Sequence, residues 1–448
     1  MSAKQEEPDQ ALPWVPNTLR ALRHRNYRLL IFGQLISLTG SWMQSTAQGW
    51  LVYQLTDSKF LLGLVGFASQ VPVLALGVLG GVVADAMSRH RTVLITQILL
   101  MVQALLLAVL TLVPGPDGRP LIQVWHIILL AVFAGSVQAF DMPARQAFLV
   151  QVVPKYDINN AIALNSLTFN AARVFGPALA GMLIAIMQGL ARTRQNFGEG
   201  MCFLINALSF VAVIVQLMRM DASAKQLRPV GPTTEADLAS ALHYLRHRLH
   251  LRALMYHAGA VALLGLPYLV LLPAVAKDTL GGDSRMLGWL TTSVGVGAMT
   301  GGVLMARRKH IQGLGKVIAG ATAAFGLTVI VVAQTSTPWL ACVGFGIAGL
   351  CMVSAMISSQ TLVQSLVSEN YRGRVMSFYS MMTIGMMPFG SLLVGGFAEH
   401  FNVQKALMLS GIGCIGIAAA FAWYLPAIRA AARSSPEYSS ISSGAKQK

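Results

Sequence analysis

Arg173 is the residue whose chemistry stands out in this sequence, because it is a base in the middle of a long apolar run. Placing an arginine at the centre of a membrane costs on the order of 2.5–3.5 kcal/mol, so we expect it to face a polar cavity or to pair with another group. Helical spacing places it on one face with Ser166, Asn170 and Pro177. Its planar fork suits an anionic or hydrogen-bond-accepting group of a solute. The structural alternatives are bonds to backbone carbonyls of neighbouring helices, or a pair with Asp141.

Polar and sulfur-containing side chains recur at helical spacing in three other apolar runs, and we expect these faces to line an aqueous cavity. Methionine surfaces are adaptable, which suits a bulky or variable organic solute. The alternative for each face is interhelical hydrogen bonding or core packing. The faces are Gln34, Ser37, Ser41, Gln44 and Gln48; Ser354, Ser358, Thr361 and Ser365; and Met376, Tyr379, Met382 and Met386. The candidate cavity and substrate residues are therefore Gln34, Ser37, Ser41, Gln44, Asn170, Arg173, Tyr379 and Met382.

The sequence contains none of the motifs that would make it an enzyme of a familiar class. It lacks the phosphate-binding Gly-x-x-x-x-Gly-Lys-Ser/Thr, His-Glu-x-x-His and Gly-x-Ser-x-Gly. We expect no catalytic residue, no cofactor and no bound metal. The cysteines lack metal-ligand spacing and should be buried, inert thiols; they are Cys202, Cys342, Cys351 and Cys414. Asp85, Asp141 and Glu399 fall near the ends of apolar runs, so proton coupling through a carboxylate at mid-membrane is not supported.

Composition indicates that these residues are positioned by membrane-spanning helices. Hydrophobic residues make up 55% of the 448 residues and charged residues 11%. Apolar runs of about 20 residues recur from Leu29 to Leu425, and a helix of that length crosses about 30 Å of hydrocarbon. We predict an all-α membrane protein with twelve spans, near residues 28–52, 61–85, 92–113, 122–142, 161–188, 200–219, 252–274, 286–306, 314–334, 338–362, 374–398 and 404–425.

The excess of basic residues follows the predicted membrane topology. The formal net charge is +16, but most of the 33 Lys and Arg residues fall in cytoplasmic segments if the N-terminus is cytoplasmic. Both termini are then cytoplasmic, and the charge requires no nucleic-acid partner. The bases left outside are Lys59, Arg119, Arg192, Arg194, Lys277, Arg285 and Lys405.

The chain divides into two similar halves. A shift of 214 residues superposes five residues of the fourth and fifth spans on five of the tenth and eleventh, which indicates six-helix halves related by a pseudo-twofold axis. The pairs are Gln146 and Gln360, Val153 and Val367, Phe175 and Phe389, Gly176 and Gly390, and Gly181 and Gly395. The expected segments are a tail 1–27, a half 28–219, a central loop 220–250, a half 251–427 and a tail 428–448.

The central loop has leucines at spacing 4-3-4, from Leu238 to Leu249, opposite His243, His247 and His250. We interpret this as an amphipathic helix on the cytoplasmic membrane surface. A three-histidine metal site is the alternative, although no nearby carboxylate or cysteine supports it.

The turn after the second predicted span carries a motif, residues 80–91, that ends a long apolar run. Its residues Gly81, Asp85, Arg89 and Arg91 resemble the loop motif of the major facilitator superfamily, although Ala86 and Ser88 depart from that pattern. The resemblance implies a conformational switch at a cytoplasmic hinge. In it, Gly81 allows close backbone approach, Asp85 faces the start of the eleventh span near Arg374, and Arg89 pairs with Asp141 to stabilise the outward-open state.

The fifth span carries Gly176, Pro177 and Gly181, which resemble a motif that exporters of this superfamily have in the same span. The segment from Arg372 to Ser377 is also similar to the bacterial drug, macrolide and siderophore exporter branch, of the transmembrane secretion effector type. The resemblance implies a secondary active exporter of a small organic solute, such as a drug, siderophore or metabolite. It would work by alternating access in a bacterial cytoplasmic membrane, as a monomer in the lipid bilayer, with a coupling proton as a further partner. The alternatives are a carrier of lysophospholipid or lipid-like solutes, and a non-transporting scaffold or sensor on the same fold.

Overall fold

The computed structural model describes residues 16–191, 195–220, 244–246, 248–308 and 311–433. This part of the chain is helical apart from an isolated bridge between Pro114 and Pro120. Eleven of its helical stretches are long and apolar enough to cross a membrane. α1 (Arg25–Thr56), with 32 residues, is also long enough, and its lower hydropathy reflects its polar face. The described helices therefore confirm the predicted all-α membrane fold.

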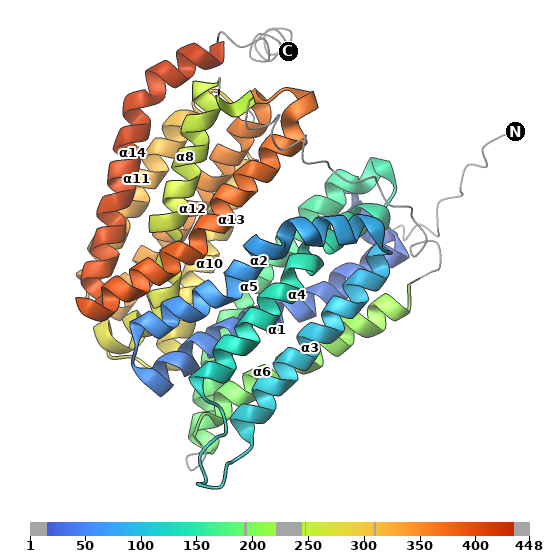
Figure 1. The fold of residues 1–448 in the computed structure, drawn as a ribbon, viewed down its shortest axis with the longest axis vertical. Helices are drawn as coiled ribbons and strands as arrows, with labels where there is room; N and C mark the ends of the chain where they lie inside the picture. The colour runs from blue at the N-terminus through green and yellow to red at the C-terminus, as the bar shows by residue number, and fades with distance from the viewer. Residues whose placement is uncertain (1–15, 192–194, 221–243, 247, 309–310, 434–448) are drawn as a thin grey trace, which may run out of the picture.

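Six of these helices form the first bundle (Figure 1). They are α1, α2 (Lys59–Ala86), α3 (Arg89–Leu112), α4 (Val124–Gln151), α5 (Ile158–Leu190) and α6 (Phe197–Met218). Two short 3₁₀ segments, η1 (Asn17–Arg23) and η2 (Lys155–Asp157), lie at the same end as the start of α1. Buried aromatic and aliphatic side chains of neighbouring helices fill the bundle.

The second bundle follows the same order but begins with an irregular span. That span consists of α8 (Leu249–Leu264), the 3₁₀ segment η4 (Leu266–Leu271), α9 (Leu272–Ala274) and the π-helical η5 (Val275–Thr279). Pro267 and Pro273 each lack a backbone N–H, which accounts for the break in regular helix. The bundle is completed by α10 (Ser284–Ala306), α11 (Leu314–Ala333), α12 (Pro338–Leu366), α13 (Glu369–His400) and α14 (Val403–Arg433).

The two bundles touch mainly through α2 against α13 and α5 against α10. Both contacts are backbone to backbone: a Cβ on Gly395 would lie 2.9 Å from the Cα of Gly63, and one on Gly181 would lie 2.7 Å from the carbonyl oxygen of Ser284. These contacts join the bundles at the end where α2 begins and α5 finishes. We call it the closed end.

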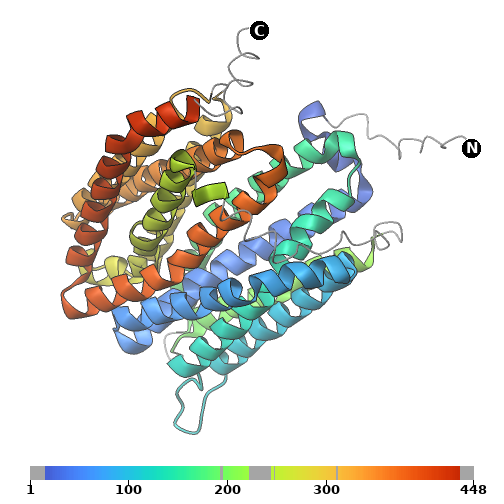
Figure 2. The ribbon, with the colours of Figure 1, turned by 45° about the horizontal axis from the view of Figure 1, so that its top comes forward.

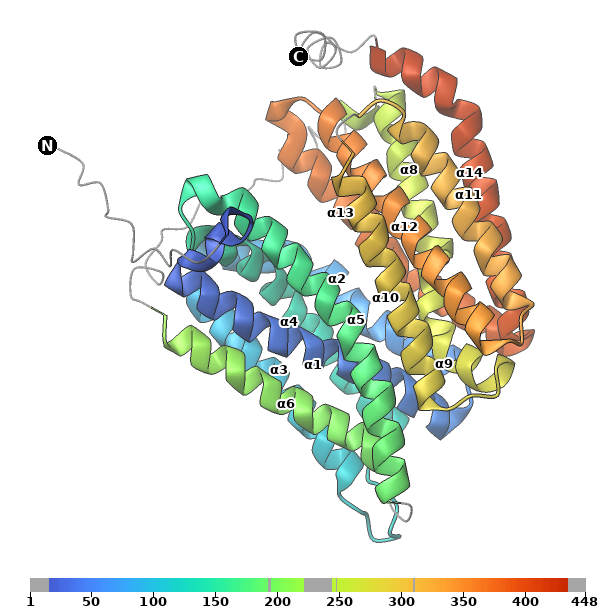
Figure 3. The same ribbon diagram turned by 180° about the vertical axis from the view of Figure 1, so that it is seen from behind.

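The bundles diverge toward the opposite end, which lies at the top of Figure 1 and holds the last turns of α14 (Figures 1, 2 and 3). At Gly77 and Gly81, near that end of α2, no described atom lies within 4 Å of where a Cβ would stand. We call this the open end.

Several helices run further than the sequence predicted. α4 was expected to finish near residue 142 but continues to Gln151, with Pro143 accommodated inside it. Asp141 therefore lies ten residues, or about 15 Å, before the end of its helix. The seventh span was likewise predicted to finish at residue 274, whereas its π-helical turn extends it to Thr279.

Candidate functional site

Arg173 lies midway along α5, at a level where its backbone packs against Gly295 of α10 in the other bundle. Its guanidinium carbon is 5.7 Å from the centroid of the Trp42 ring on α1, a cation–π geometry. Tyr268 of η4, in the other bundle, lies nearby. Among the described residues its guanidinium has no hydrogen bond or ion pair, so the alternatives of a pair with Asp141 and of carbonyl bonds are wrong within this part of the chain.

Asn170 and Ser166 precede Arg173 on the same face of α5, as predicted. The Asn170 amide donates a hydrogen bond to the backbone oxygen of Ser166 at 2.8 Å, which fixes its side chain along the helix. Ser166 is exposed and Asn170 is half-buried. The face is therefore partly open and polar, with a cation at its centre.

The polar face of α1 does not line an open cavity at Gln44, so this prediction is wrong. The Gln44 amide nitrogen donates to Gln103 on α3 at 3.0 Å, and its oxygen accepts from Asn206 on α6 at 2.8 Å. The hydroxyl of Ser41 donates to the carbonyl oxygen of Ser37. Helical spacing showed that these side chains share a face, but the neighbours of that face are set by the packing of α1 against α3 and α6.

Gln34 and Ser37 are buried, and they line a small pocket inside the first bundle. Gln97 and Arg145 line the same pocket, with Leu30, Val93 and Val213 as its apolar walls. The cavity role predicted for Gln34 and Ser37 therefore applies to an internal pocket and not to the space between the bundles.

Asp141 is fully buried beside this pocket and forms an ion pair with Arg145, one turn further along α4. Its carboxylate also accepts hydrogen bonds from Thr96 at 2.7 Å and Gln97 at 2.9 Å. The Asp141 carboxylate is therefore already paired within α4, and the predicted Arg89–Asp141 pair stays a prediction. Because α4 continues past Asp141, it places a base one turn away on the same helix.

The candidate residues of the second bundle have separate positions. Tyr379 is buried and lines a small pocket between α8, α12 and α13. Met382 packs toward α8, its sulfur 3.5 Å from where a Cβ of Gly259 would stand. Ser354 and Ser358 of α12 are buried against α10, and the Ser358 hydroxyl lies 3.3 Å from the Met305 sulfur. The cavity face predicted for the tenth span is therefore a helix-packing face at these two serines.

The fifth-span motif lies where α5 packs against two helices. A Cβ on Gly176 would be 2.5 Å from the Cβ of Trp42 on α1, and Gly181 lies against Ser284 and Gly288 of α10. Pro177 is buried between them without interrupting α5. The motif thus places helices in close contact, within the first bundle at Gly176 and between bundles at Gly181.

The loop motif is only partly described. Gly80, and not Gly81, makes the close approach in this conformation, against Ala139 and Phe140 of α4. The side chain of Asp85 lies outside the described residues, so its pairing with Arg374 stays a prediction. The guanidinium of Arg374 lies 5.9 Å from the ring centroid of Tyr371, and Arg91 is exposed.

The histidines of the central loop provide no metal site within the described residues. No group of three or more His, Cys, Asp or Glu side chains in this part of the chain is placed to hold a metal. His243 and His247, together with most of the predicted amphipathic helix, lie outside it. His250 is buried at the start of α8, so its predicted place on the membrane surface is wrong. Cys202, Cys351 and Cys414 are buried free thiols, and Cys342 is half-buried.

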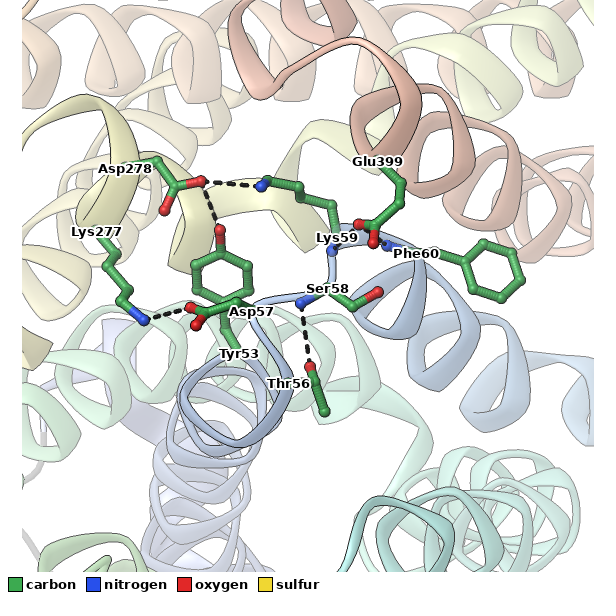
Figure 4. A network of polar contacts seen from close by, with 9 residues as sticks. All are labelled: Tyr53, Thr56, Asp57, Ser58, Lys59, Phe60, Lys277, Asp278 and Glu399. Carbon is green, nitrogen blue, oxygen red and sulfur yellow. Dashed lines mark hydrogen bonds and ion pairs between the residues drawn. The ribbon is translucent and has the colours of Figure 1, made fainter.

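A set of charged contacts across the closed end was not predicted from the sequence (Figure 4). Asp278, in η5 of the second bundle, accepts a hydrogen bond from the Tyr53 hydroxyl at 2.5 Å and pairs with Lys59 at 3.2 Å. The next residue toward the N-terminus, Lys277, pairs with Asp57, which ends α1 in the left-handed conformation. These contacts join the hairpin of α1 and α2 to the end of the seventh span.

Glu399 completes the contacts from α13. Its carboxylate accepts from the backbone N–H of Lys59 at 2.6 Å and of Phe60 at 3.3 Å, at the start of α2. A carboxylate is favourable there because a helix N-terminus has unpaired N–H groups and a partial positive charge. We call these residues, Tyr53, Asp57, Lys59, Lys277, Asp278 and Glu399, the closed-end network.

Sequence reasoning counted Lys59 and Lys277 only as bases outside the membrane. The signal that could have found the network is the opposite charge next to each of them: Asp57 precedes Lys59 by two residues, and Asp278 follows Lys277. Acid–base neighbours at matching ends of both halves favour pairing across the junction.

Two six-helix bundles that meet at one end, with a half-buried arginine midway along a helix at their interface, have the architecture of a transporter of the major facilitator superfamily, and not of an enzyme. The chain belongs to the transmembrane secretion effector family, whose sequence profile matches residues 16–442.

The similar characterised proteins are distant in sequence, but their alignments cover most of the chain. The chain is 24% identical over 383 residues to the staphyloferrin A transporter of Staphylococcus aureus, covering 85% of this chain and 92% of that protein. It is 23% identical over 412 residues to the multidrug efflux pump Tap of Mycolicibacterium fortuitum, with 90% and 96% covered. Macrolide efflux protein A of Streptococcus pyogenes is 22% identical over 405 residues, with 88% and 96% covered.

Solved structures share the fold. A bacterial homologue of the human lysosomal transporter Spinster, in an inward-facing and unoccupied conformation, matches with a TM-score of 0.66 and 14% identity, covering 92% of this chain and 97% of that one. A POT family transporter in complex with 5-aminolevulinic acid matches with a TM-score of 0.69 and 10% identity, covering 90% and 96%.

Proposed function

We propose that this protein is a secondary active exporter that moves a small organic solute across a bacterial cytoplasmic membrane by alternating access. The observation that carries the proposal is the contrast between the two ends. The closed end is joined by ion pairs and glycine contacts, and the open end is separated, with Arg173 between them. Export is supported by the fifth-span motif and by the relatives, which are named for siderophore transport and for drug and macrolide efflux.

Flux measured with the purified protein in proteoliposomes tests this function. The solutes are staphyloferrin A, a macrolide and a cationic dye, with a fluorescent lysophospholipid as the lipid-like alternative. Protein-dependent movement of one of the first three supports the exporter. Movement of the lysophospholipid alone would support the lipid carrier, and no flux of any solute without an added partner would support a scaffold or sensor.

The proposed topology places both termini, and hence the open end, in the cytoplasm, because the basic residues gather there. We expect an impermeant thiol reagent added to intact cells to label Asp117→Cys, in the exposed connection between α3 and α4, in a background without the native cysteines. Lys155→Cys, exposed in η2, should react only after permeabilisation. The opposite pattern would invert the topology and place the open end outside.

Arg173 is proposed to bind an anionic or hydrogen-bond-accepting group of the solute. Its guanidinium lies over Trp42 and near Tyr268, so both bundles contribute to its surroundings. A ligand bound there would contact both bundles, and its release could therefore accompany their rearrangement.

Replacing Arg173 should weaken binding of an acidic solute. Arg173→Gln is expected to lower affinity roughly ten- to one-hundredfold, since a hydrogen bond to a charged group is worth about 1.5–3 kcal/mol. The affinity of Arg173→Lys should fall between those of the wild type and Arg173→Gln, because lysine keeps the charge without the planar fork. Binding is measured by calorimetry on the purified protein, with Arg119→Gln, in the exposed connection after α3, as the control. Unchanged affinity in Arg173→Gln together with a collapse of thermal stability would show a structural role.

A further inference from the structure

The pocket of the second bundle that contains Tyr379 has polar groups with no assigned role. It is a small pocket between α8, α12 and α13, with space for about one water molecule. Most of its walls are alanine, valine, leucine and methionine side chains. The polar side chains that line it are His257, Ser359, Tyr379 and Thr383.

One ring nitrogen of His257 has a hydrogen-bond partner among the described residues and the other has none. The side chain is 5% exposed, and its Nε2 lies 3.1 Å from the hydroxyl oxygen of Thr322 on α11. Its ring centroid is 4.8 Å from that of Phe421 on α14. Nδ1 is buried and has no hydrogen-bond partner among the described residues.

Ser359 of α12 lines the same pocket. Its side chain is 2% exposed, and its hydroxyl lies near Tyr379 but forms no well-aligned hydrogen bond with any described residue. A buried polar atom without a partner is costly, so two such atoms lining one pocket from two helices indicate a polar occupant.

The charges around the pocket restrict what that occupant can be. Facing α8 are Thr322 from α11, Ser359 from α12, Tyr379 from α13 and Phe421 from α14, none of them ionised at neutral pH. The other titratable groups nearby are His250, two turns earlier on α8, and Cys414, which lies beside Gly265. The described lining contains no carboxylate for a metal ion and no fixed base for an anion. The lining of the pocket is therefore suited to bind water, and a proton transferred from that water.

We propose that His257 and this pocket form a proton-binding site, which would be the coupling site of the exporter proposed above. The Nδ1 lone pair accepts a proton from hydronium, which leaves as water. The resulting imidazolium donates from Nδ1 to the oxygen of Ser359, Tyr379 or a pocket water, and from Nε2 to Thr322.

The link to conformation comes from the helices that enclose the ring. A charged imidazolium is poorly tolerated between apolar walls, so the neutral ring favours the present arrangement of α8 and α13. α13 also carries Glu399 and Gly395, which hold α2 at the closed end. Protonation therefore favours an arrangement in which the pocket is better hydrated and α13 has moved.

The protein alone, in nanodiscs and without solute, tests this inference. Spin-label pairs at Lys155 and Arg307 report on the open end, and pairs at Asp117 and Gln334 report on the closed end. Between pH 8 and pH 5 we expect the open-end distance to shorten and the closed-end distance to lengthen. His257→Gln should lose this pH dependence, while His400→Gln, exposed at the end of α13, should keep it. Ser359→Ala keeps the ring but removes one acceptor, so the transition should move to lower pH.

If the spin-label distances respond to pH identically in His257→Gln and in the wild type, His257 is not the proton-binding site. Nitrogen-15 NMR of labelled histidines gives a second measurement. It must show one titrating signal that disappears in His257→Gln, and its absence between pH 5 and pH 8 would also overturn the inference. A failure of the alternating-access proposal can be distinguished from a failure of the proton site. Weakening the closed-end network with Asp278→Asn should redistribute both distances at every pH if the bundles move, whatever the role of His257.

Discussion

Asp278→Asn is expected to shift the conformational equilibrium toward opening of the closed end roughly tenfold. The change removes the ionic partner of Lys59 and weakens the acceptor of the Tyr53 hydroxyl, two contacts that cross between bundles. The side chains of Lys59 and Asp278 are 22% and 31% exposed, so water screens the pair in part and about 1.4 kcal/mol is a reasonable total. Reactivity of a cysteine placed at the closed end, measured by stopped-flow labelling, gives the ratio of conformations.

Asp117→Asn is the matched control, because it removes an exposed carboxylate in the α3–α4 connection at the same end. A shift of equal size in that control would show a general effect of charge and not of the network. The second pair allows a rescue: Asp57→Lys and Lys277→Asp should each open the closed end alone, and together should restore it with the charges exchanged. Failure of the double variant to recover would mean that this ion pair does not hold the bundles together.

Arg145→Leu is expected to destabilise the protein by about 3–5 kcal/mol, because it leaves the buried Asp141 carboxylate without its cation. Thr96 and Gln97 still donate hydrogen bonds to that carboxylate, but neither neutralises its charge. The result should be a large loss of thermal stability in detergent and poor recovery of folded protein, measured by a thiol-independent melting assay.

The double variant Asp141→Asn with Arg145→Gln separates charge from shape. It removes both charges and keeps hydrogen-bonding groups, so it should recover most of the lost stability, since a buried ion pair adds little net stability over a neutral replacement. Arg91→Leu, an exposed base at the start of α3, should melt close to the wild type. A double variant as unstable as Arg145→Leu would show that the loss comes from packing around the α4 pocket.

Much of the fold could be predicted from the sequence because apolar length and helical period are local properties. The apolar runs around Leu107 and Phe345 form helices in which these two side chains are fully buried. The repeat that related Gly181 to Gly395 matched two glycines that both lie at contacts between bundles. Local patterns also gave the position of Arg173 midway along a helix.

The partners of polar residues could not be predicted in the same way, since they depend on how helices pack. Gln44 was expected to face water but faces Gln103 and Asn206, residues 59 and 162 positions away. Asp141 was assigned to a helix end because the span was predicted to finish near residue 142, yet the helix continues and brings Arg145 into reach. His257 attracted no attention because a lone histidine in an apolar run has no distinguishing spacing.

The glycine contacts between the bundles have a consequence for the speed of the motion. Where large side chains interdigitate, one helix must climb over the ridges of the other in order to slide. At Gly63 with Gly395, and at Gly181 with Gly288, the touching surfaces are backbone atoms with no side chain to interlock. The helices can therefore slide past each other at these two crossings with little steric resistance. Most of the activation barrier would then lie in separating the charges of the closed-end network, and little in remaking a core.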